Sequence, residues 1–381
     1  MDFSWTPQQQ AKHSQAKEFA KQLDTSDLIQ RDQQGSFSKE LWNRCAEFGI
    51  QALTIPTKFG GDDCSILDAI TTIENLSYGC RDNGLLFALN AQLWTVQQPL
   101  LQFGNEEQKE KFLKPLCSGE KIAAHALTEP QSGSDVYSLS TTADKCEGGY
   151  LLNGRKHLIT LAPIADFFLV FTTTNLTLGK WGLTAFLIPA EQKGLTIGAT
   201  QPKMGLRTVP IGEIEFKDCF VPDNYRLGKE GAGFSITNHS LEFDRIGCMA
   251  AHVGAMERQL QDTISYTRER KQFGEPIQSF QSVSNRLAEM KLRLETSRLL
   301  LYKTAWLKST GQATTMESSL LKLHLSESFL QSSLDTIRNH GGSGYLTETE
   351  VERDLRDSVG GVIYAGTSDI QRNIISKLIE S

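Results

Sequence analysis

The spacing of apolar and polar residues first predicts a region of amphipathic helices over residues 1–118. The run L-W-N-R-C-A-E-F-G follows Ser38 and stops at Gly49, which is typical of a helix with a polar cap at one end and glycine at the other. A second helix is predicted to begin at Ser65 or Asp68. A third is predicted over G-N-E-E-Q-K-E-K-F-L, because acidic residues in its first turn suit the helix dipole. We therefore expect an N-terminal helical domain.

Between residues 119 and 228 the apolar runs become short and alternating. F-F-L-V-F-T-T-T and L-T-A-F-L-I-P are rich in β-branched and aromatic residues, as strands are. The segment G-G-Y-L-L-N-G-R-K-H-L-I-T predicts a hairpin with Asn153-Gly154 at its turn. A central β-domain over residues 119–228 is the expected result.

From residue 229 to residue 381 the helical period returns. Leu287, Met290, Leu294 and Leu301 fall on one helical face, which is typical of the core of a bundle. Long helices with short connections favour a four-helix bundle. The predicted fold is therefore a multi-domain α+β protein, with a helical domain, a β-domain and a helical bundle in that order.

Composition and charge narrow the classes of function. The chain has 381 residues, 39% of them apolar, and a net charge of −6 without any block of Lys and Arg, which argues against a nucleic-acid partner. It lacks an apolar run near the ~18 residues of a membrane span, and its first residues lack the pattern of a signal peptide. The seven cysteines are scattered, without C-x-x-C or a zinc-ligand spacing, so we expect free thiols, no metal and a cytoplasmic protein.

Two polar, glycine-containing segments are candidates for ligand contact. Residues 127–135 read L-T-E-P-Q-S-G-S-D, where hydroxyl donors and Gly133 permit close approach to a ring or a phosphate. Residues 341–357 read G-G-S-G-Y-L-T-E-T-E-V-E-R-D-L-R-D, without the glycine spacing of a Rossmann or P-loop motif. Taken singly, the first is equally consistent with a surface turn and the second with a helix C-cap.

Four motifs in order resemble the acyl-CoA dehydrogenase family. They are the two segments above, R-x-x-F-G at Arg270–Gly274 between them, and G-T-S-D-I-Q-R at residues 366–372. The resemblance covers nearly the whole chain. It implies FAD held between the β-domain and the bundle of a homotetramer, built as a dimer of dimers. It also implies an acyl thioester substrate, and a flavoprotein or oxygen as the electron acceptor.

The resemblance assigns expected ligand contacts by position. Those expected around the flavin ring and the adjoining ribityl chain are Leu127, Thr128, Gly133, Ser134, Leu158, Ile159 and Thr160. Those expected to reach the FAD of a neighbouring subunit are Arg270, Phe273, Gln281, Gly341 and Gly342, with Arg338 suited to the same anionic cofactor. Thr367 and Asp369 are expected near the pyrophosphate. The expected substrate contacts are Ser134, Arg245, Tyr364, Ala365 and Gly366.

Ala365 departs from the family pattern at the position of the usual catalytic glutamate, and its methyl group cannot accept a proton. Some relatives keep a glutamate directly before the arginine of the segment that here reads S-L-E-F-D-R-I-G, where this chain has Asp244 and Arg245. We therefore predict Asp244 as the base; Glu242, or no carboxylate base at all, are the alternatives. Leu158 occupies a position where many relatives have tryptophan, which leaves one face of the flavin more open.

The leading interpretation is an FAD-dependent dehydrogenase that removes the α-hydrogen of an acyl thioester as a proton and passes the β-hydrogen as hydride to flavin N5. The acyl group is carried by coenzyme A or by an acyl carrier protein. C-R-D-N-G-L at residues 80–85 resembles enzymes that act on carrier-bound units in polyketide or peptide assembly, a form of secondary metabolite biosynthesis. The alternatives are a flavin oxidase or monooxygenase on the same scaffold, and a non-catalytic FAD-binding relative.

Overall fold

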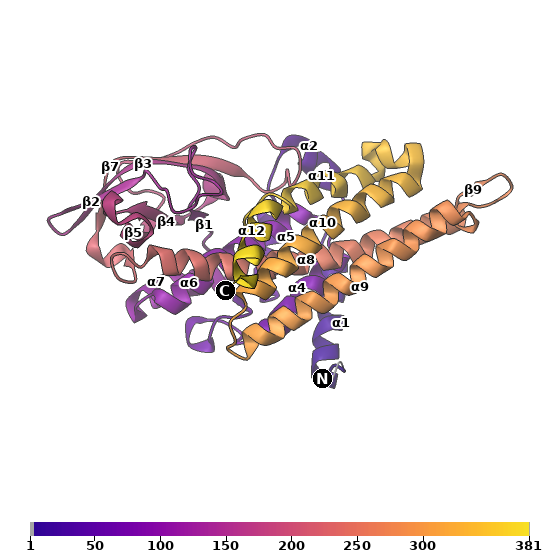
Figure 1. The fold of residues 1–381 in the computed structure, drawn as a ribbon, viewed down its shortest axis with the longest axis horizontal. Coiled ribbons are helices and arrows are strands. Elements are labelled where there is room, and N and C mark those ends of the chain that lie inside the picture. Colours follow the sequence, from indigo (N-terminus) through magenta and orange to yellow (C-terminus); the bar gives the residue numbers. More distant parts are fainter. Residues whose placement is uncertain (1–3, 381) are drawn as a thin grey trace.

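The computed structural model describes residues 4–380, and its elements follow the predicted order of helices, strands and helices (Figure 1). The N-terminal helices are α1 (Pro7–Lys21), α2 (Leu28–Gln34), α3 (Lys39–Glu47), α4 (Ile66–Gly79), α5 (Asn83–Gln92), α6 (Gln98–Phe103) and α7 (Glu106–Cys117). Local caps explain several of their starts: the hydroxyls of Ser38 and Ser65 accept from the amides of Leu41 and Asp68. The predicted start at Ser65 is therefore confirmed.

The central region is one sheet of eight strands. They are β1 (Ala123–Ala126), β2 (Thr142–Cys146), β3 (Gly149–Thr160), β4 (Phe167–Thr173), β5 (Leu183–Pro189), β6 (Leu195–Ile197), β7 (Ile211–Pro222) and β8 (Arg226–Leu227). The strand order is β6-β7-β3-β2-β4-β5-β8, and β1 pairs with β4 in parallel. All residues of β4 are buried, because elements cover both of its faces.

The predicted turn at Asn153-Gly154 is wrong. Strand β3 runs through both residues, and the hairpin with β2 turns instead between Cys146 and its partner Gly149. Gly154 lies where the ladder to β7 changes register, and a Cβ there would come within 2.6 Å of Thr141. The glycine therefore permits close packing inside a bulged strand, a requirement that local sequence does not reveal.

The C-terminal region contains α8 (Gly233–Glu269), α9 (Gln281–Ser309), α10 (Thr315–His340), α11 (Val351–Gly361) and α12 (Ser368–Ile379). Helices α8, α9 and α10 pack along one another, and α11 packs on α10. The predicted apolar face of α9 is confirmed, because Leu287, Met290, Leu294 and Leu301 are all buried. The strand pair β9 (Lys271–Gln272) and β10 (Glu275–Pro276) joins α8 to α9.

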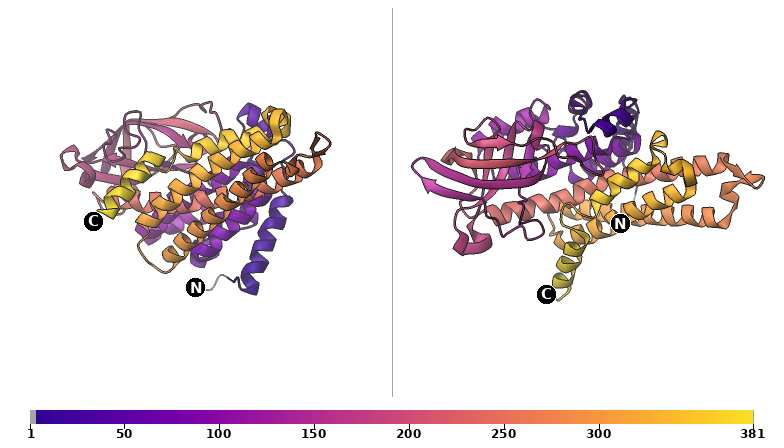
Figure 2. Two further views of the ribbon diagram at one scale, coloured as in Figure 1. Left: turned by 45° about the vertical axis from the view of Figure 1, so that its right-hand side comes forward. Right: turned by 90° about the horizontal axis from the view of Figure 1, so that it is seen from above.

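Helix α8 connects the two ends of the molecule. Its first residues pack against β5, and its last residues carry the β9–β10 hairpin at the end farthest from the sheet (Figures 1 and 2). The predicted helix–β–helix fold is confirmed, whereas the domain boundaries after residues 118 and 228 stay predictions. No helix within residues 4–380 is long and apolar enough to cross a membrane.

Candidate active site

A large cavity, about 910 Å³ in volume, lies between the sheet region and the C-terminal helices. Its wall combines three groups of residues from distant parts of the chain. The first comprises Leu127, Thr128, Gly133, Ser134, Leu158, Ile159 and Thr160; the second comprises Asn238, Leu241, Asp244 and Arg245 of α8; the third comprises Tyr364, Ala365, Gly366 and Thr367 before α12. The volume falls within the range of roughly 300–1,000 Å³ that is usual for ligand and cofactor sites.

Asp244 places a carboxylate in the wall of this cavity. The thiol of Cys248, one helical turn later on the same face of α8, donates to Asp244 Oδ1 over 3.0 Å. Burial raises the pKa of Asp244 to about 6, although the Cys248 hydrogen bond and the positive charges of Arg245 and Lys322 oppose the rise. A carboxylate with a pKa near the working pH is suited to accept and release a proton.

Glu242, the alternative base, is not among the residues that line the cavity in the described part of the chain. The hydroxyl of Thr314 donates to its carboxylate, and Lys308 Nζ lies 3.1 Å from Glu242 Oε1. The Glu242 carboxylate is therefore bound to the last turn of α9, through Lys308, and to the residue before α10, Thr314. Its position gives it contacts typical of a structural ion pair.

The turn before α12 is fixed from two sides. Arg245 Nε donates to the carbonyl of Ala365 over 3.2 Å, and Gln371 Nε2 donates to the carbonyls of Ala365 and Gly366. Ala365 has a φ of 55°, a left-handed conformation that costs a residue with a Cβ about 1 kcal/mol. Arg245, which is 7% exposed, thus holds a strained turn in the cavity wall.

The segment after β1 is held by a buried ion pair. Lys156 Nζ lies 2.7 Å from Glu129 Oε1 and also donates to the carbonyl of Leu127 over 3.0 Å, and both charged side chains are 0% exposed. The amides of Ser140 and Thr141 donate to the same Glu129 carboxylate. Burial opposes the ionisation of Glu129, but Lys156 and these donors lower its pKa to about 2. The loop that faces the cavity therefore has a fixed backbone.

The cavity wall fits a flat heteroaromatic group joined to a phosphate chain. One part of the wall is the fixed loop with the hydroxyls of Thr128 and Ser134, and a Cβ added at Gly133 would meet nothing within 4 Å. Another part is Thr367 at the N-terminal end of α12, a twelve-residue helix whose first amides favour an anion. Asp369 lies outside the described cavity wall and pairs with Arg372 at 2.7 Å.

The remaining predicted cofactor residues lie elsewhere in the chain's own structure. Arg270, Phe273, Gln281, Arg338, Gly341 and Gly342 are not part of the described cavity wall. Phe273, in the β9–β10 hairpin, is 93% exposed. Tyr266 and His340 stack at 4.2 Å and so bring the ends of α8 and α10 together at this end of the bundle. That these residues reach a neighbouring subunit's FAD stays a prediction.

Sequence reasoning missed several residues of the cavity. Phe87 of α5 and Leu206 of the β6–β7 connection line it, and no local motif distinguishes either of them. Tyr137 also lines it, and its hydroxyl donates to Asn238 of α8 over 2.6 Å. Cys248 is not in the described wall of this cavity, but it contacts Asp244 and could have been found, because it follows Asp244 by one helical turn.

Family models match almost the whole chain. The acyl-CoA dehydrogenase N-terminal domain matches residues 6–120, the middle domain residues 124–219 and the C-terminal domain residues 231–379. The chain therefore belongs to the acyl-CoA dehydrogenase family, whose members are FAD-dependent oxidoreductases. Three predictions are therefore confirmed: the family, the enzymatic nature of the protein, and FAD as its cofactor.

Individual relatives include enzymes named for carrier proteins and for coenzyme A. The chain is 42% identical over 378 residues to the L-prolyl-(peptidyl-carrier protein) dehydrogenase of a Serratia species. This alignment covers 99% of this chain and 98% of that protein. It is 37% identical over 375 residues to the short-chain specific acyl-CoA dehydrogenase of Megasphaera elsdenii, covering 97% of each. The prolyl acyl carrier protein oxidase AnaB is a solved structure with a TM-score of 0.97 and 46% identity, covering 99% of this chain and 100% of that one.

Proposed function

We propose that this protein is an FAD-dependent dehydrogenase that oxidises an acyl thioester and uses Asp244 as its base. The observation that carries the proposal is the Asp244 carboxylate, which faces the cavity with a pKa of about 6 while position 365 offers only a methyl group. Asp357 also lines the cavity, but its two oxygens accept hydrogen bonds from the Leu206 amide and from Asn83. Asp244 is therefore the better candidate.

The acyl group we propose is a prolyl group on a carrier protein. Support comes from two relatives, 42% and 46% identical over almost the whole chain, whose names specify a prolyl group on a peptidyl or acyl carrier protein. The relative named for an acyl-CoA substrate is less similar, at 37% identity. A carrier of this kind places the enzyme in the assembly of a peptide or polyketide product.

Different residues at the cavity are proposed to bind FAD, to accept the proton and to hold the Ala365 turn in place. Leu127, Thr128 and Ser134 are proposed to hold the flavin, with Thr367 near the pyrophosphate. When bound, FAD accepts the hydrogen that leaves the substrate with its electron pair. The thiol of Cys248 orients the base by donating to Asp244 Oδ1, so Oδ2 is the oxygen that we propose takes the α-proton. Arg245 keeps the Ala365 turn in place through its carbonyl.

We propose that the active assembly is a homotetramer in which each FAD is completed by a neighbouring subunit. The basis is that Arg270, Phe273 and Gln281 lie in or beside the β9–β10 hairpin, which is at the end of the bundle farthest from the sheet (Figure 1), and that none of them is in the described cavity wall. Phe273 is almost fully exposed there. Sedimentation analysis of the holoenzyme tests this: Phe273→Asp is expected to yield smaller species that release FAD, and a tetramer that keeps its FAD would contradict it.

Use of oxygen as the electron acceptor is a second candidate. Leu158 stands in the cavity wall with 52% of its surface exposed, and the solved relative AnaB is named as an oxidase. Oxygen consumption in the presence of substrate, compared with reduction of an electron-transferring flavoprotein, separates an oxidase from a dehydrogenase.

Anaerobic bleaching of the flavin by prolyl-loaded carrier protein tests the main proposal. Wild-type holoenzyme is expected to bleach, Asp244→Asn to bind FAD without bleaching, and Glu242→Gln to bleach like the wild type. The Glu242 variant is a matched control, because it removes a carboxylate two residues away that lies outside the described cavity wall. Bleaching by Asp244→Asn at the wild-type rate would refute the role of Asp244. Wild-type holoenzyme that no acyl thioester bleaches would favour the non-catalytic alternative.

A further inference from the structure

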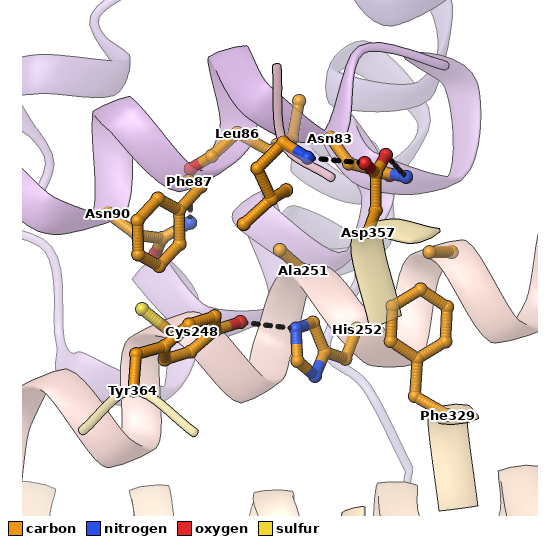
Figure 3. A pocket seen from close by; sticks show the side chains of 12 residues that line it. Asn83, Leu86, Phe87, Asn90, Cys248, Ala251, His252, Phe329, Asp357 and Tyr364 are labelled. Atoms are coloured by element: carbon orange, nitrogen blue, oxygen red, sulfur yellow. Dashed lines mark hydrogen bonds between the residues drawn. The ribbon is translucent and has the colours of Figure 1, made fainter. Parts of the chain in front are cut away.

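A second, much smaller cavity, whose lining residues are drawn in Figure 3, adjoins the large one, because the two share part of their walls. Its volume is about 20 Å³, enough for about one water molecule. Phe87, Leu206, Asp357 and Tyr364 line both cavities. These residues therefore form a partition, and removing part of it would extend the large cavity between α5, α8 and α11.

Two aromatic rings make up the apolar part of this partition. Phe87 comes from α5 and Tyr364 from the turn before α12, and their ring centroids lie 4.6 Å apart with the planes tilted by 44°. Rings at this distance and angle are in favourable contact. A substrate chain that met this wall could continue only by separating the pair.

Tyr364 is fixed in place by His252. The Tyr364 hydroxyl and His252 Nε2 share a hydrogen bond of 2.6 Å, and Figure 3 shows the phenol pointing at the imidazole with Phe329 on the other side. The His252 and Phe329 rings lie 4.7 Å apart, and a Cβ on Gly361 would come within 2.7 Å of His252 Cε1. Burial lowers the pKa of His252 to about 3, so the ring stays neutral.

The consequence is a rigid wall. Swinging Tyr364 aside would break its hydrogen bond to His252 and leave the buried imidazole without that partner. The imidazole cannot follow the phenol, because Phe329 and the backbone of α11 occupy the space beside it.

The wall stands close to the proposed base. Tyr364 directly precedes Ala365, whose carbonyl accepts from Arg245, the neighbour of Asp244. Cys248 donates to Asp244 and also lines the small cavity behind the wall. An acyl group whose α-carbon lies at Asp244 therefore has the Phe87–Tyr364 pair as its next neighbour.

We infer that the Phe87–Tyr364 pair is the specificity-determining floor of the acyl site, which admits a compact acyl group such as a five-membered ring and excludes extended acyl chains. The inference rests on the proposed function in one respect, namely that an acyl thioester binds with its α-carbon at Asp244. It adds the class of acyl group that the chain's own residues select.

Equilibrium binding separates this inference from the chemistry. Dissociation constants for butyryl- and octanoyl-pantetheine are measured by calorimetry on holoenzyme carrying Asp244→Asn, so that ligand is bound and not consumed. Adding Phe87→Ala joins the two cavities and is expected to favour octanoyl over butyryl at least about tenfold more than the parent does, since each buried methylene contributes about fourfold. Phe87→Leu, a smaller deletion, is expected to shift the ratio in the same direction by less.

Phe37→Ala is the matched control, because Phe37 is a half-buried phenylalanine near Trp42 that is part of neither described cavity wall. It is expected to leave the ratio unchanged. The inference is overturned if both Phe87 variants leave the ratio where Phe37→Ala leaves it, or if the parent already binds octanoyl with the full methylene gain. Flavin bleaching of the wild-type enzyme by prolyl-loaded carrier protein is a separate measurement. Its failure would remove the prolyl assignment and leave the role of the Phe87–Tyr364 pair in place.

Discussion

Replacing Asp244 by asparagine should remove turnover and stabilise the protein in the same variant. Asparagine has nearly the shape of aspartate and can still accept the Cys248 hydrogen bond, so the cavity keeps its geometry. It cannot take a proton from the substrate. A general base typically contributes a factor of about 10² to 10⁴, so we expect flavin reduction to slow by at least about 10²-fold.

The gain in stability follows from the raised pKa. A rise from the ordinary aspartate value of 3.8 to about 6 in the folded protein corresponds to about 3 kcal/mol. Because the folded protein holds this proton more tightly than the unfolded chain does, the free energy of unfolding falls as the pH rises from about 4 to about 6. Above pH 6 the buried, ionised Asp244 lowers the free energy of unfolding by the full amount of about 3 kcal/mol. Asparagine is uncharged and avoids this loss.

Thermal unfolding of the two holoenzymes at several pH values measures this difference. For 381 residues, about 3 kcal/mol corresponds to about 4 °C in Tm, with Asp244→Asn the higher at pH 7.5 and the difference vanishing toward pH 4. Glu242→Gln is the control, because it breaks the Lys308 ion pair and should show no such gain. A Tm difference that does not change with pH would refute the assignment of the raised pKa to Asp244.

Four further predictions follow from the contacts around the site. Cys248→Ala removes a hydrogen bond that lowers the pKa of Asp244, so the acid limb of the kcat/KM profile, which we expect near pH 6 in the wild type, should move up by roughly half to one pH unit. Cys248→Ser should restore the wild-type profile. Ala365→Gly should raise the free energy of unfolding by about 1 kcal/mol in denaturant titrations, because it relieves the positive φ; Ala365→Glu added to Asp244→Asn should restore measurable flavin bleaching. Glu129→Gln should lower the free energy of unfolding by about 3 kcal/mol in the same titrations, because it leaves Lys156 as an unpaired buried charge. Adding Lys156→Met removes that charge and should recover part of the loss.

The parts of the fold that were predictable are those encoded by neighbouring residues. Helix starts at Ser38 and Ser65 depend on a hydroxyl and an amide three residues apart, so a short segment of sequence contains the whole interaction. The turn expected at Asn153-Gly154 failed for the opposite reason. Gly154 is required because Thr141, from another segment of the chain, packs against it and leaves no room for a Cβ. The residues next to Gly154 in the sequence do not indicate this contact.

The same distinction applies to the site. Motifs led to Thr128, Ser134 and Ala365 because each motif is a continuous segment, and the structure brings these segments to one cavity. Phe87 and Leu206 join them only through the packing of α5 and of the β6–β7 connection, which is a long-range property. The pKa of Asp244 likewise depends on how deeply α8 is buried, which the spacing of residues along α8 does not determine.

The buried pair of Lys156 and Glu129 has a consequence for how the enzyme acquires its cofactor. The pair, together with the Leu127 carbonyl and the amides of Ser140 and Thr141, is complete within the polypeptide and shielded from salt. The loop that we propose receives the flavin can therefore take its shape before the flavin arrives, and binding of FAD does not bear the entropy of ordering this loop. We expect the apoprotein to be stripped and reconstituted with FAD repeatedly without refolding.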